Sequence, residues 1–413
     1  MQVLHLLRKY NPVEWGGTET AVKRLLDGLR AHSVDSKVLC PALQTPVLSD
    51  PFQASGHTVE RFNAFVPVLG ISETQRQQLI SVGGNLMSFD LFPKLLKKRY
   101  SVLHTHAGNR LGGMALTAAK LKRVPLVSSI HGGVLDLPQK TREYLQKPLA
   151  GGFEWGKVFG AVFQSRKVLS DSDAILTCNR KEAELQQKQF PNKRVIIQPH
   201  GVTAADYARD YRADAELAFP QIVGKDILLI VGRIDPVKNQ SWVVDQSPAI
   251  FEKFPNSLLV LAGSCTDAPY GKSIEKKIDH LGLQNKILLT GGLPPGDPRL
   301  IGLFQKARAV LLPSISETFG LVIIEAWASG TAVISSKNSG ALDLIQPGTN
   351  GWLFDLGDPS GFHEAVRTAL TQPDVANAFA QAGRLVVCQQ FDTAVLGGKV
   401  KRLYEELIEE KQK

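Results

Sequence analysis

The segment from Ala309 to Ser336 reads "AVLLPSISETFGLVIIEAWASGTAVISS", and its pattern decides the fold. Two short apolar runs, "AVLLP" and "TAVISS", enclose a helical stretch that begins near Gly320. Short apolar runs of this kind fit strands that are buried on both faces of a parallel sheet. The segment between them is long enough for a crossover helix, so the stretch predicts one β–α–β unit.

The same alternation of apolar runs and helical stretches continues along the whole chain. The first half contains "QVLHLL", "SKVLC", "YSVLHTH", "PLVSSIH", "AILTC" and "RVIIQPH". The second half adds "DILLIVGR", "SLLVLAG", "KILLTGG" and "GWLF". This pattern predicts α/β architecture that occurs twice.

The length of 413 residues is too great for one ordinary core, which favours two domains. We expect an N-terminal domain over residues 1–203 and a C-terminal domain over 226–390. Residues 204–225 are polar and alanine-rich without a strand, and we expect a linker there with a short helix. Residues 391–413 show helical spacing of apolar residues and predict a terminal helix that packs back toward the N-terminal domain. Prolines and glycines across residues 42–86 predict loops around one or two short strands.

The composition is that of a soluble globular protein, with 43% hydrophobic and 21% charged residues. No apolar run reaches the ~18–20 residues that span a bilayer. The first residues predict a strand and not a signal peptide, because no basic leader precedes the apolar run. The four cysteines are far apart and form no Cys-x-x-Cys pair, which favours free thiols. We therefore expect a cytoplasmic protein.

The formal charge of +9 favours anionic partners. The sequence lacks the interleaved aromatic and basic residues of a nucleic-acid module, so we expect no nucleic-acid partner. One basic cluster leaves two interpretations open: solvated helix ends, or a surface for peripheral contact with an anionic membrane at the inner face of the cell membrane. The cluster comprises Lys94, Lys97, Lys98, Arg99, Lys120, Lys122 and Arg123.

Ligands of open α/β sheets bind at the carboxyl ends of strands, so the residues there are the first candidates for a site. Gly16 and Gly17 follow the first strand and precede a helix, where free N–H groups can hold an anion; an ordinary turn is the alternative. His131 follows another strand in "SSIHGG", and His106 has the same type of position in "LHTHAG". A lone histidine at such a position is more often structural than catalytic.

Two charged pairs of the second half suggest a nucleotide-sugar site. Arg233 and Lys238 follow a strand in "ILLIVGRIDPVKNQ", and two fixed cations suit a diphosphate; a solvated loop is the alternative. Glu317 falls in the loop after a strand, and Glu325 lies on the helix that follows. Such acids can hold two separate sets of hydroxyls, as a hexose and a ribose on either side of a diphosphate present them.

Together the motifs resemble the retaining glycosyltransferases of the GT-B fold, family 4, also called group 1. The resemblance covers most of the chain and rests on "GGTE", "IHGG", "VGRIDPVKN", "LLPSISETFGLVIIEAWASGTAVI" and "NSGALDLIQPGTNGWLF". It implies two Rossmann-like domains that face each other across a deep interdomain cleft. It also implies transfer of a hexose-type sugar from a nucleoside-diphosphate sugar to a hydroxyl of a glycan, glycolipid or small-molecule acceptor, as in cell-surface polysaccharide synthesis. We favour a UDP-sugar over a GDP-sugar as the donor.

The resemblance also implies roles for single residues. Glu317 contacts hydroxyls of the donor sugar, and Glu325 binds the ribose. Arg233 and Lys238 hold the diphosphate, and His131 lies near the anomeric carbon. The other donor-binding positions belong to the glycine loop, the base pocket, and the loop and helix start that face the sugar and phosphates: Gly16, Gly17, Gly292, Leu293, Phe319, Gly320, Leu321 and Val322.

Two positions depart from the pattern of the family, Asn179 and His200, and they leave the acceptor contacts open. No Asp-x-Asp motif stands where a metal clamp would, so we expect no metal and no cofactor. The alternatives on the same fold are a sugar phosphorylase and a nucleotide-sugar epimerase. A Rossmann dehydrogenase would need a dinucleotide fingerprint, which the chain lacks. A non-catalytic nucleotide-binding module is disfavoured by the intact set of Arg233, Lys238 and Glu317.

Overall fold

The computed structural model describes the chain except for residues 13–15, 43–49, 82–83, 133–134, 136–148 and 150. The described residues form two compact units. Unit 1 comprises Met1–Pro199 and Ala394–Lys413, and unit 2 comprises His200–Thr393.

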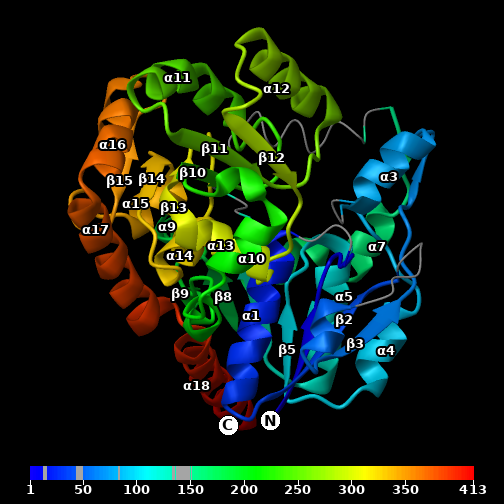
Figure 1. Cartoon of the computed structure of the whole chain (residues 1–413). Coiled ribbons are helices and arrows are strands. Elements are labelled where there is room, and N and C mark those ends of the chain that lie inside the picture. The colour runs from blue at the N-terminus through cyan, green and yellow to red at the C-terminus, as the bar shows by residue number, and fades with distance from the viewer. Residues whose placement is uncertain (13–15, 43–49, 82–83, 133–134, 136–148, 150) are drawn as a thin grey trace. The chain divides into compact units, whose positions relative to one another are not determined.

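Unit 1 is built on a parallel sheet of seven strands (Figure 1). The strand order is β3-β2-β1-β5-β6-β8-β9, so the order reverses between β1 and β5. A separate antiparallel pair joins β4 (Val68–Leu69) to β7 (Phe153–Glu154). The strands of the sheet are β1 (Gln2–Leu6), β2 (Asp35–Pro41), β3 (Thr58–Phe62), β5 (Val102–Thr105), β6 (Leu126–Ile130), β8 (Ala174–Thr177) and β9 (Val195–Ile197).

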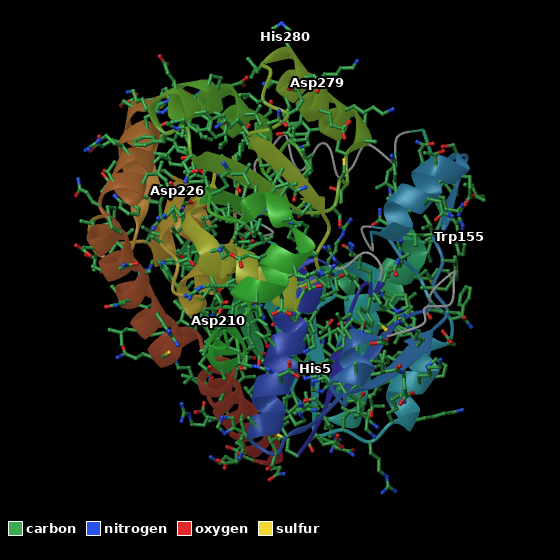
Figure 2. All side chains as sticks on the ribbon, in the orientation of Figure 1. His5, Trp155, Asp210, Asp226, Asp279 and His280 are labelled. Atoms are coloured by element: carbon green, nitrogen blue, oxygen red, sulfur yellow. The ribbon has the colours of Figure 1, made fainter. Side chains whose placement is uncertain are left out.

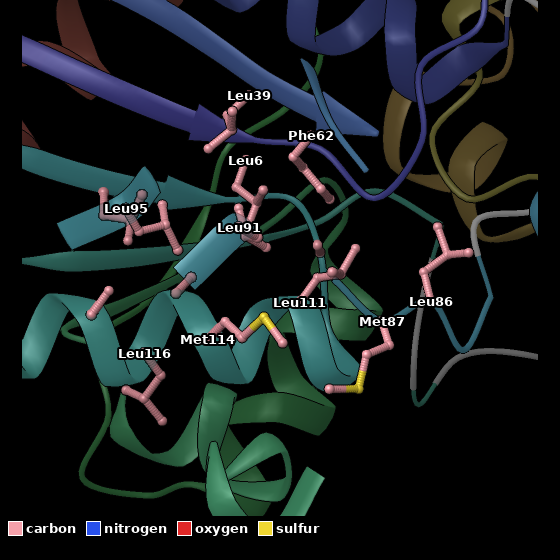
Figure 3. Packing of buried hydrophobic residues seen from close by; sticks show 14 of the residues in the cluster. Leu6, Leu39, Phe62, Leu86, Met87, Leu91, Leu95, Leu111, Met114 and Leu116 are labelled. Atoms are coloured by element: carbon pink, nitrogen blue, oxygen red, sulfur yellow. The ribbon is translucent and has the colours of Figure 1, made fainter. Parts of the chain in front are cut away.

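Helices cover both faces of this sheet, because the central strands place buried apolar residues alternately on opposite faces. On one face Val3 packs with α1 (Gly17–Ala31) and α18 (Thr393–Gln412). On the other, Leu4 and Leu6 pack with α3 (Glu73–Ser81), α4 (Leu91–Lys97) and α5 (Asn109–Lys122). Figure 3 shows the second core, where Leu6 and Leu39 lie with residues of α4 and α5. In the described part of unit 1 the other helices are α2 (Pro51–Ala54), α7 (Lys157–Val162), η2 (Ser165–Lys167), α8 (Val168–Asp171) and α9 (Arg180–Gln189).

Unit 2 contains a parallel sheet of six strands in the order β12-β11-β10-β13-β14-β15, which reverses between β10 and β13. One face packs on α11 (Gln240–Lys253), α12 (Ala268–His280) and α16 (Ser360–Thr371). The strands also contact α13 (Pro298–Lys306), α14 (Leu321–Ala328) and α17 (Pro373–Val386). The strands are β10 (Asp226–Val231), β11 (Ser257–Ala262), β12 (Ile287–Gly291), β13 (Ala307–Leu312), β14 (Val333–Ser336) and β15 (Trp352–Phe354). The unit also contains helix α15 (Ser339–Leu344) and the π-helical turn η5 (Val387–Phe391).

The predicted α/β class with two parallel sheets is confirmed, and each apolar run named above forms a strand. Residues 204–225 differ from the expected linker, because they belong to unit 2 and fold onto it. They contain η3 (Ala204–Tyr207), α10 (Arg212–Ala218) and η4 (Pro220–Ile222). Helix α10 packs on α13, and Tyr211 N donates to Gln305 Oε1 at 2.8 Å at the start of that helix. The contacts with α13 explain why a polar segment without a strand is nevertheless integral to the unit.

Candidate active site

The reversal point of the unit 2 sheet brings two of the predicted residues together. Lys238 follows β10 and Glu317 follows β13, and Lys238 Nζ lies 2.5 Å from Glu317 Oε2. The two side chains are 21% and 17% exposed, so this ion pair lies in a partly desolvated place. Ligands of open α/β sheets bind where the strand order reverses, at the carboxyl ends of the strands. The pair therefore occupies the expected place for a ligand site in this unit.

Asp235 organises the loop that carries the two predicted cations. Its Oδ1 accepts hydrogen bonds from the backbone N–H groups of Val237 and Lys238 at 3.0 Å. Its Oδ2 lies 2.9 Å from Arg233 Nη2. Asp235 is buried, whereas the Arg233 side chain is 57% exposed and accessible to an anion. The sequence reasoning missed Asp235, although its place within "GRIDPVK" is that of a residue that caps a turn.

The loop that holds Glu317 depends on two glycines. Gly320 has φ of +93° and is the N-cap of α14, a conformation that a residue with a side chain rarely adopts. Gly340 donates its N–H to Glu317 O at 2.9 Å. A Cβ atom on Gly340 would lie 2.6 Å from the carbonyl carbon and oxygen of Phe319. The backbone of the loop is therefore fixed by close contact with α15. The helix predicted near Gly320 begins at Leu321.

Glu325 lies one to two turns into α14 and is 5% exposed. A carboxylate at this burial is retained only with polar partners, which distinguishes it from a solvated helix glutamate. Of the neighbouring predicted positions, Phe319 is buried, and Leu321 and Val322 are half-buried.

Gly292 and Leu293 follow β12 at the same edge of the sheet, and Gly292 is exposed. A Cβ atom on Gly292 would lie 2.0 Å from Ser264 Oγ, so the loops after β11 and β12 touch. The loop after β11 also pairs with the loop after β10, through Ile234 and Cys265. The role of Gly292 and Leu293 in a base pocket stays a prediction.

In unit 1 the helix predicted after the first strand begins at Gly17, with Gly16 as the N-cap. Within the described part of the chain no side chain caps this helix start. Glu19, in the first turn, is 1% exposed, and among the described residues its Oε1 has no hydrogen-bond partner. A negative charge in the first turn is favoured by the helix dipole. Glu19 belongs to the motif "GGTE" that follows the first strand.

His131 is joined to a row of buried histidines that the sequence reasoning did not assemble. His106 Nδ1 lies 2.7 Å from His131 Nε2, and His106 Nε2 lies 3.1 Å from His5 Nδ1. The side chain of His5 lies inside unit 1 (Figure 2) and is fully buried. Beside them His104 Nδ1 is bonded to Tyr404 Oη at 2.6 Å on α18, and its Nε2 to Ser129 Oγ at 2.7 Å.

Burial keeps these imidazoles neutral. Desolvation, and to a lesser degree His57, lowers the pKa of His5 to about 3. Desolvation, and secondly the charge of Arg8, lowers the pKa of His131 to about 4. Burial also lowers the pKa of His104 well below its usual value. The rings of His5, His104 and His131 are therefore uncharged at neutral pH and act as hydrogen-bond donors and acceptors.

The histidines also raise the question of a metal ion. Ring nitrogens of His5, His104 and His106 lie within 4.8 Å of one another. Five of their six ring nitrogens, however, already take part in the hydrogen bonds named above. A metal ion would have to replace several of these bonds, so the geometry favours a hydrogen-bonded row of neutral rings.

The two departures from the family pattern have local explanations. Asn179 is the N-cap of α9, and its Oδ1 accepts from Glu182 N at 2.7 Å, the task that serine or threonine performs at such positions. The His200 ring packs edge-on against Phe319, with 5.0 Å between the ring centroids. His200 is thus a neighbour of the loop that carries Glu317.

Comparison with known proteins identifies the family of both halves of the chain. A family profile described as "Glycosyl transferase 4-like domain" matches residues 16–201. A second profile, described as "Glycosyl transferases group 1", matches residues 215–386. Together the two profiles include every predicted site residue.

Curated relatives and solved structures agree with this result. The glycogen synthase of Mycobacterium tuberculosis is 26% identical, over 98% of this chain and 94% of the relative. The Escherichia coli UDP-Gal:alpha-D-GlcNAc-diphosphoundecaprenol alpha-1,3-galactosyltransferase is 24% identical, over 80% of this chain and 81% of the relative. The crystal structure of Anabaena HepE with UDP-glucose has the same fold, with a TM-score of 0.71, 18% identity, and coverage of 98% and 100% of the two chains. The chain therefore belongs to the group 1 glycosyltransferases of the GT-B fold.

Proposed function

We propose that this glycosyltransferase moves a hexose-type sugar from a nucleoside-diphosphate sugar to an acceptor hydroxyl, with retention and without a metal ion. The observation that carries the proposal is the cluster of Arg233, Lys238 and Glu317 at the reversal point of the unit 2 sheet. Two cations and a carboxylate at one sheet edge suit a diphosphate beside sugar hydroxyls.

In this reaction the bond between the anomeric carbon and the phosphate oxygen breaks, and its electron pair stays on the leaving diphosphate. Arg233 and Lys238 stabilise the charge that develops on the diphosphate oxygens, which is the task of a metal ion in other transferases. The acceptor oxygen bonds to the anomeric carbon on the same face, and its proton passes to a phosphate oxygen. His131, neutral at pH 7, takes part by hydrogen bonding near the anomeric carbon.

Glu317 fits a role in binding hydroxyls better than a role as covalent nucleophile. Its carboxylate is held by Lys238 at 2.5 Å. A carboxylate paired with an ammonium group is a weaker nucleophile, because its charge is already compensated. When a donor diphosphate attracts Lys238, the carboxylate becomes available to the hydroxyls of the sugar.

A thermal-shift panel with UDP-, GDP- and ADP-sugars tests the donor assignment. We expect one nucleotide series to raise the melting temperature, by mass action on the folded state. We favour the UDP series, because the Anabaena HepE structure contains UDP-glucose and the E. coli relative is named for UDP-Gal.

Proton NMR of the first product formed then shows the anomeric configuration, and inversion would contradict retention. A phosphorylase would instead use inorganic phosphate as the acceptor, and an epimerase would convert the donor into a different nucleotide sugar without transfer.

For the acceptor we propose a glycan or a lipid-linked sugar of a cell-surface polysaccharide. The name of the E. coli relative contains a lipid diphosphate acceptor, which supports this class. Among the described residues no helix is both long and apolar enough to cross a membrane. A lipid-linked acceptor would therefore require peripheral contact of a cytoplasmic enzyme with the membrane.

The basic cluster of unit 1 is partly neutralised within the fold. Lys94, Lys98 and Lys120 each form an ion pair with an aspartate or glutamate of the same unit. Three exposed cations are left for an anionic surface: Lys97, Arg99 and Arg123. Three such charges near an anionic bilayer contribute roughly 3 kcal/mol, which gives weak and salt-sensitive binding.

Liposome flotation decides between membrane contact and an ordinary solvated surface. We expect binding to anionic vesicles that is lost at high salt and when Lys97, Arg99 and Arg123 are replaced by glutamate. The matched control replaces three exposed lysines of unit 2 by glutamate, Lys253, Lys272 and Lys276. Equal recovery with neutral and anionic vesicles would remove the membrane proposal and leave the transferase proposal intact.

A further inference from the structure

Helix α7 is apolar, yet unit 1 does not enclose its side chains. Its sequence is KVFGAV, and none of its six residues is buried. Phe159 and Phe163, one turn apart, pack against the core that Figure 3 shows. Val158 and Val162, also one turn apart, are 68% and 64% exposed. Because residues at i and i+4 lie on one helix face, α7 directs one apolar stripe to the core and a second stripe to solvent.

Aromatic rings support the outer stripe and extend it. The Phe159 ring lies 5.9 Å from the Phe89 ring and 6.0 Å from the Trp155 ring, centroid to centroid. Phe89 is 62% exposed, and Phe153, two positions before Trp155, is 70% exposed. Exposed apolar side chains that gather in this way mark an interaction surface, whereas single ones do not. We call this set the α7 surface, and it comprises Phe89, Phe153, Val158 and Val162.

The chain around the α7 surface is strongly basic. Residues 85–99, 117–123 and 151–171 contain ten lysines and arginines but only three acids. Each of these acids is neutralised inside unit 1, since Asp90, Glu154 and Asp171 form ion pairs with lysine or arginine. Within the described part of the chain, the exposed cations of these segments that have no acidic partner are Lys97, Arg99, Arg123, Lys157, Arg166 and Lys167. The surface therefore suits an anionic partner.

The cations and the α7 surface belong to one face of unit 1. Helices α4 and α7 both pack on α5 (Figure 1). The C-terminal end of α5 is tied to both neighbours: Lys122 Nζ donates to Leu96 O of α4 at 3.0 Å, and Lys120 Nζ donates to Gln164 Oε1, between α7 and η2, at 2.9 Å. The free cations at the ends of α4 and α5 and in η2 thus lie on the same helical layer as the exposed stripe of α7.

We propose that this face of unit 1 binds an anionic lipid bilayer, with the α7 surface inserted between the headgroups and the free cations on the phosphates. The inference rests on the proposed function, in which a membrane-held acceptor is reached by peripheral contact. It adds apolar insertion to the electrostatic contact and places that insertion on α7. Aromatic and aliphatic side chains flanked by cations suit the boundary between headgroups and hydrocarbon.

The two kinds of contact depend on each other. Neither a few cations nor a few apolar side chains hold a protein on a bilayer for long, and stable attachment takes both. Salt screens the attraction between the cations and the phosphates, so the apolar side chains should leave the bilayer at high salt as well. The cations come from separate segments and no acid fixes them, so they can follow a fluid layer of phosphates.

A fluorescent dye on α7 tests insertion in the full-length protein. The exposed Cys265 and Cys388 are replaced by serine, and Val158→Cys is labelled with an environment-sensitive dye. We expect a blue shift with vesicles of phosphatidylcholine and phosphatidylglycerol, and no shift with phosphatidylcholine alone. The same dye at Leu217→Cys in unit 2, where the side chain is 85% exposed, is the control and should not respond.

The double variant Val158→Ser/Val162→Ser tests the contribution of the outer stripe. We expect its partition coefficient onto the anionic vesicles to fall about tenfold or more, because less apolar surface leaves water. The matched control, Leu217→Ser/Leu385→Ser, replaces two exposed leucines of unit 2 and should bind as the wild type does. Release of nucleoside diphosphate from the donor, measured without vesicles, should stay within about threefold of the wild type in both variants.

The possible results separate this inference from the proposed transfer activity. Vesicle-bound protein with an unshifted dye, or equal partition of the wild type and the serine variant, would show attachment through the cations alone and overturn the inference. A dye that is blue-shifted without vesicles would place another part of the chain or a second copy on α7, and would overturn it too. Failure to release nucleoside diphosphate would count against the transferase proposal, since the vesicle assays contain neither donor nor acceptor.

Discussion

Glu317 and Glu325 lie on one segment, eight positions apart, yet they have different surroundings. Glu317 is half-buried and paired with Lys238, whereas Glu325 is buried within α14. Glu317 is ion-paired with a cation that a phosphate can attract, whereas the position of Glu325 is set by the helix. This difference supports separate roles: Glu317 near the reacting sugar, and Glu325 in binding of the donor.

Glu325→Gln should act mainly on donor binding. If Glu325 holds the ribose hydroxyls in both ground state and transition state, the donor KM should rise about tenfold or more while kcat stays within about threefold. Initial rates against donor concentration measure both constants. Glu275→Gln, an exposed glutamate on α12, is the control and should leave both constants unchanged. A lost kcat with an unchanged donor KM would contradict the assignment.

The contact between Lys238 and Glu317 was foreseeable from the sequence, whereas the histidine row was not. Arg233, Lys238 and Glu317 follow strand ends, and the edge of a parallel sheet brings such positions together. His5 and His104 could not be paired in this way, because their contact depends on the register of β1 with β5. Viewed singly, each is an ordinary core histidine. The spacing of His104 and His106 at alternate positions was the available signal.

At the scale of elements, α14 and α15 hold the Glu317 loop through the backbone contact between Gly340 and Phe319. Gly340→Ala should destabilise the protein by about 1–3 kcal/mol, since a methyl group 2.6 Å from backbone atoms forces a shift. It should also raise the donor KM, because the loop that carries Glu317 must move. Urea unfolding and donor kinetics measure the two effects.

The matched control is Gly361→Ala in α16, where the new Cβ would meet only Phe354 Cβ at 3.8 Å. Alanine is the better helix former, so this variant should be as stable as the wild type or slightly more stable. Equal free energies of unfolding and equal donor KM values in Gly340→Ala and Gly361→Ala would show that the contact between α15 and the loop affects neither stability nor donor binding.

The strands β1 and β5 carry buried neutral histidines, which makes stability depend on pH. The pKa of His5 is lowered to about 3 in the folded state, so between pH 3 and 6.5 the unfolded chain binds more protons. The contribution of His5 is therefore complete above pH 6.5 and is lost as the pH falls. For one such group the loss between pH 7 and pH 5 is about 2 kcal/mol.

Urea unfolding of the wild type and His5→Phe at pH 7 and pH 5 measures how much His5 contributes to the pH dependence of the free energy of unfolding. The wild type should lose about 2 kcal/mol more than the variant over this interval. Equal losses would mean that His5 is not buried as a neutral ring in solution. Because the free energies of unfolding at the two pH values are compared within the same protein, a direct effect of the substitution on stability cancels.

Most elements could be predicted because parallel strands that are buried on both faces are uniformly apolar. The exceptions are informative. Strand β3 is an edge strand with the polar sequence "TVERF", so its pattern is weak. Helix α10 has one fully buried residue, Ala215, and its place in unit 2 comes from contacts with α13 that its own sequence does not reveal.

At the scale of the whole molecule, the candidate donor contacts are divided between the two units. Gly17 and His131 belong to unit 1, and Arg233 and Lys238 belong to unit 2. If all of them bind one donor, the units must close around it. Small-angle scattering should then give a smaller radius of gyration with a saturating nucleoside diphosphate. The double variant Arg233→Ala/Lys238→Ala should show no such change, and an unchanged radius in the wild type would contradict closure.

The most direct test of whether Arg233 and Lys238 hold the leaving diphosphate is the rate at which nucleoside diphosphate is released from a saturating donor. Arg233→Ala and Lys238→Ala should each lower turnover by ~10²-fold or more, because each removes a charge that stabilises the leaving diphosphate. The controls are Arg308→Ala and Lys277→Ala, which remove ion-paired cations elsewhere in unit 2 and should leave turnover within about threefold of the wild type. Near-wild-type turnover in both Arg233→Ala and Lys238→Ala would contradict the account.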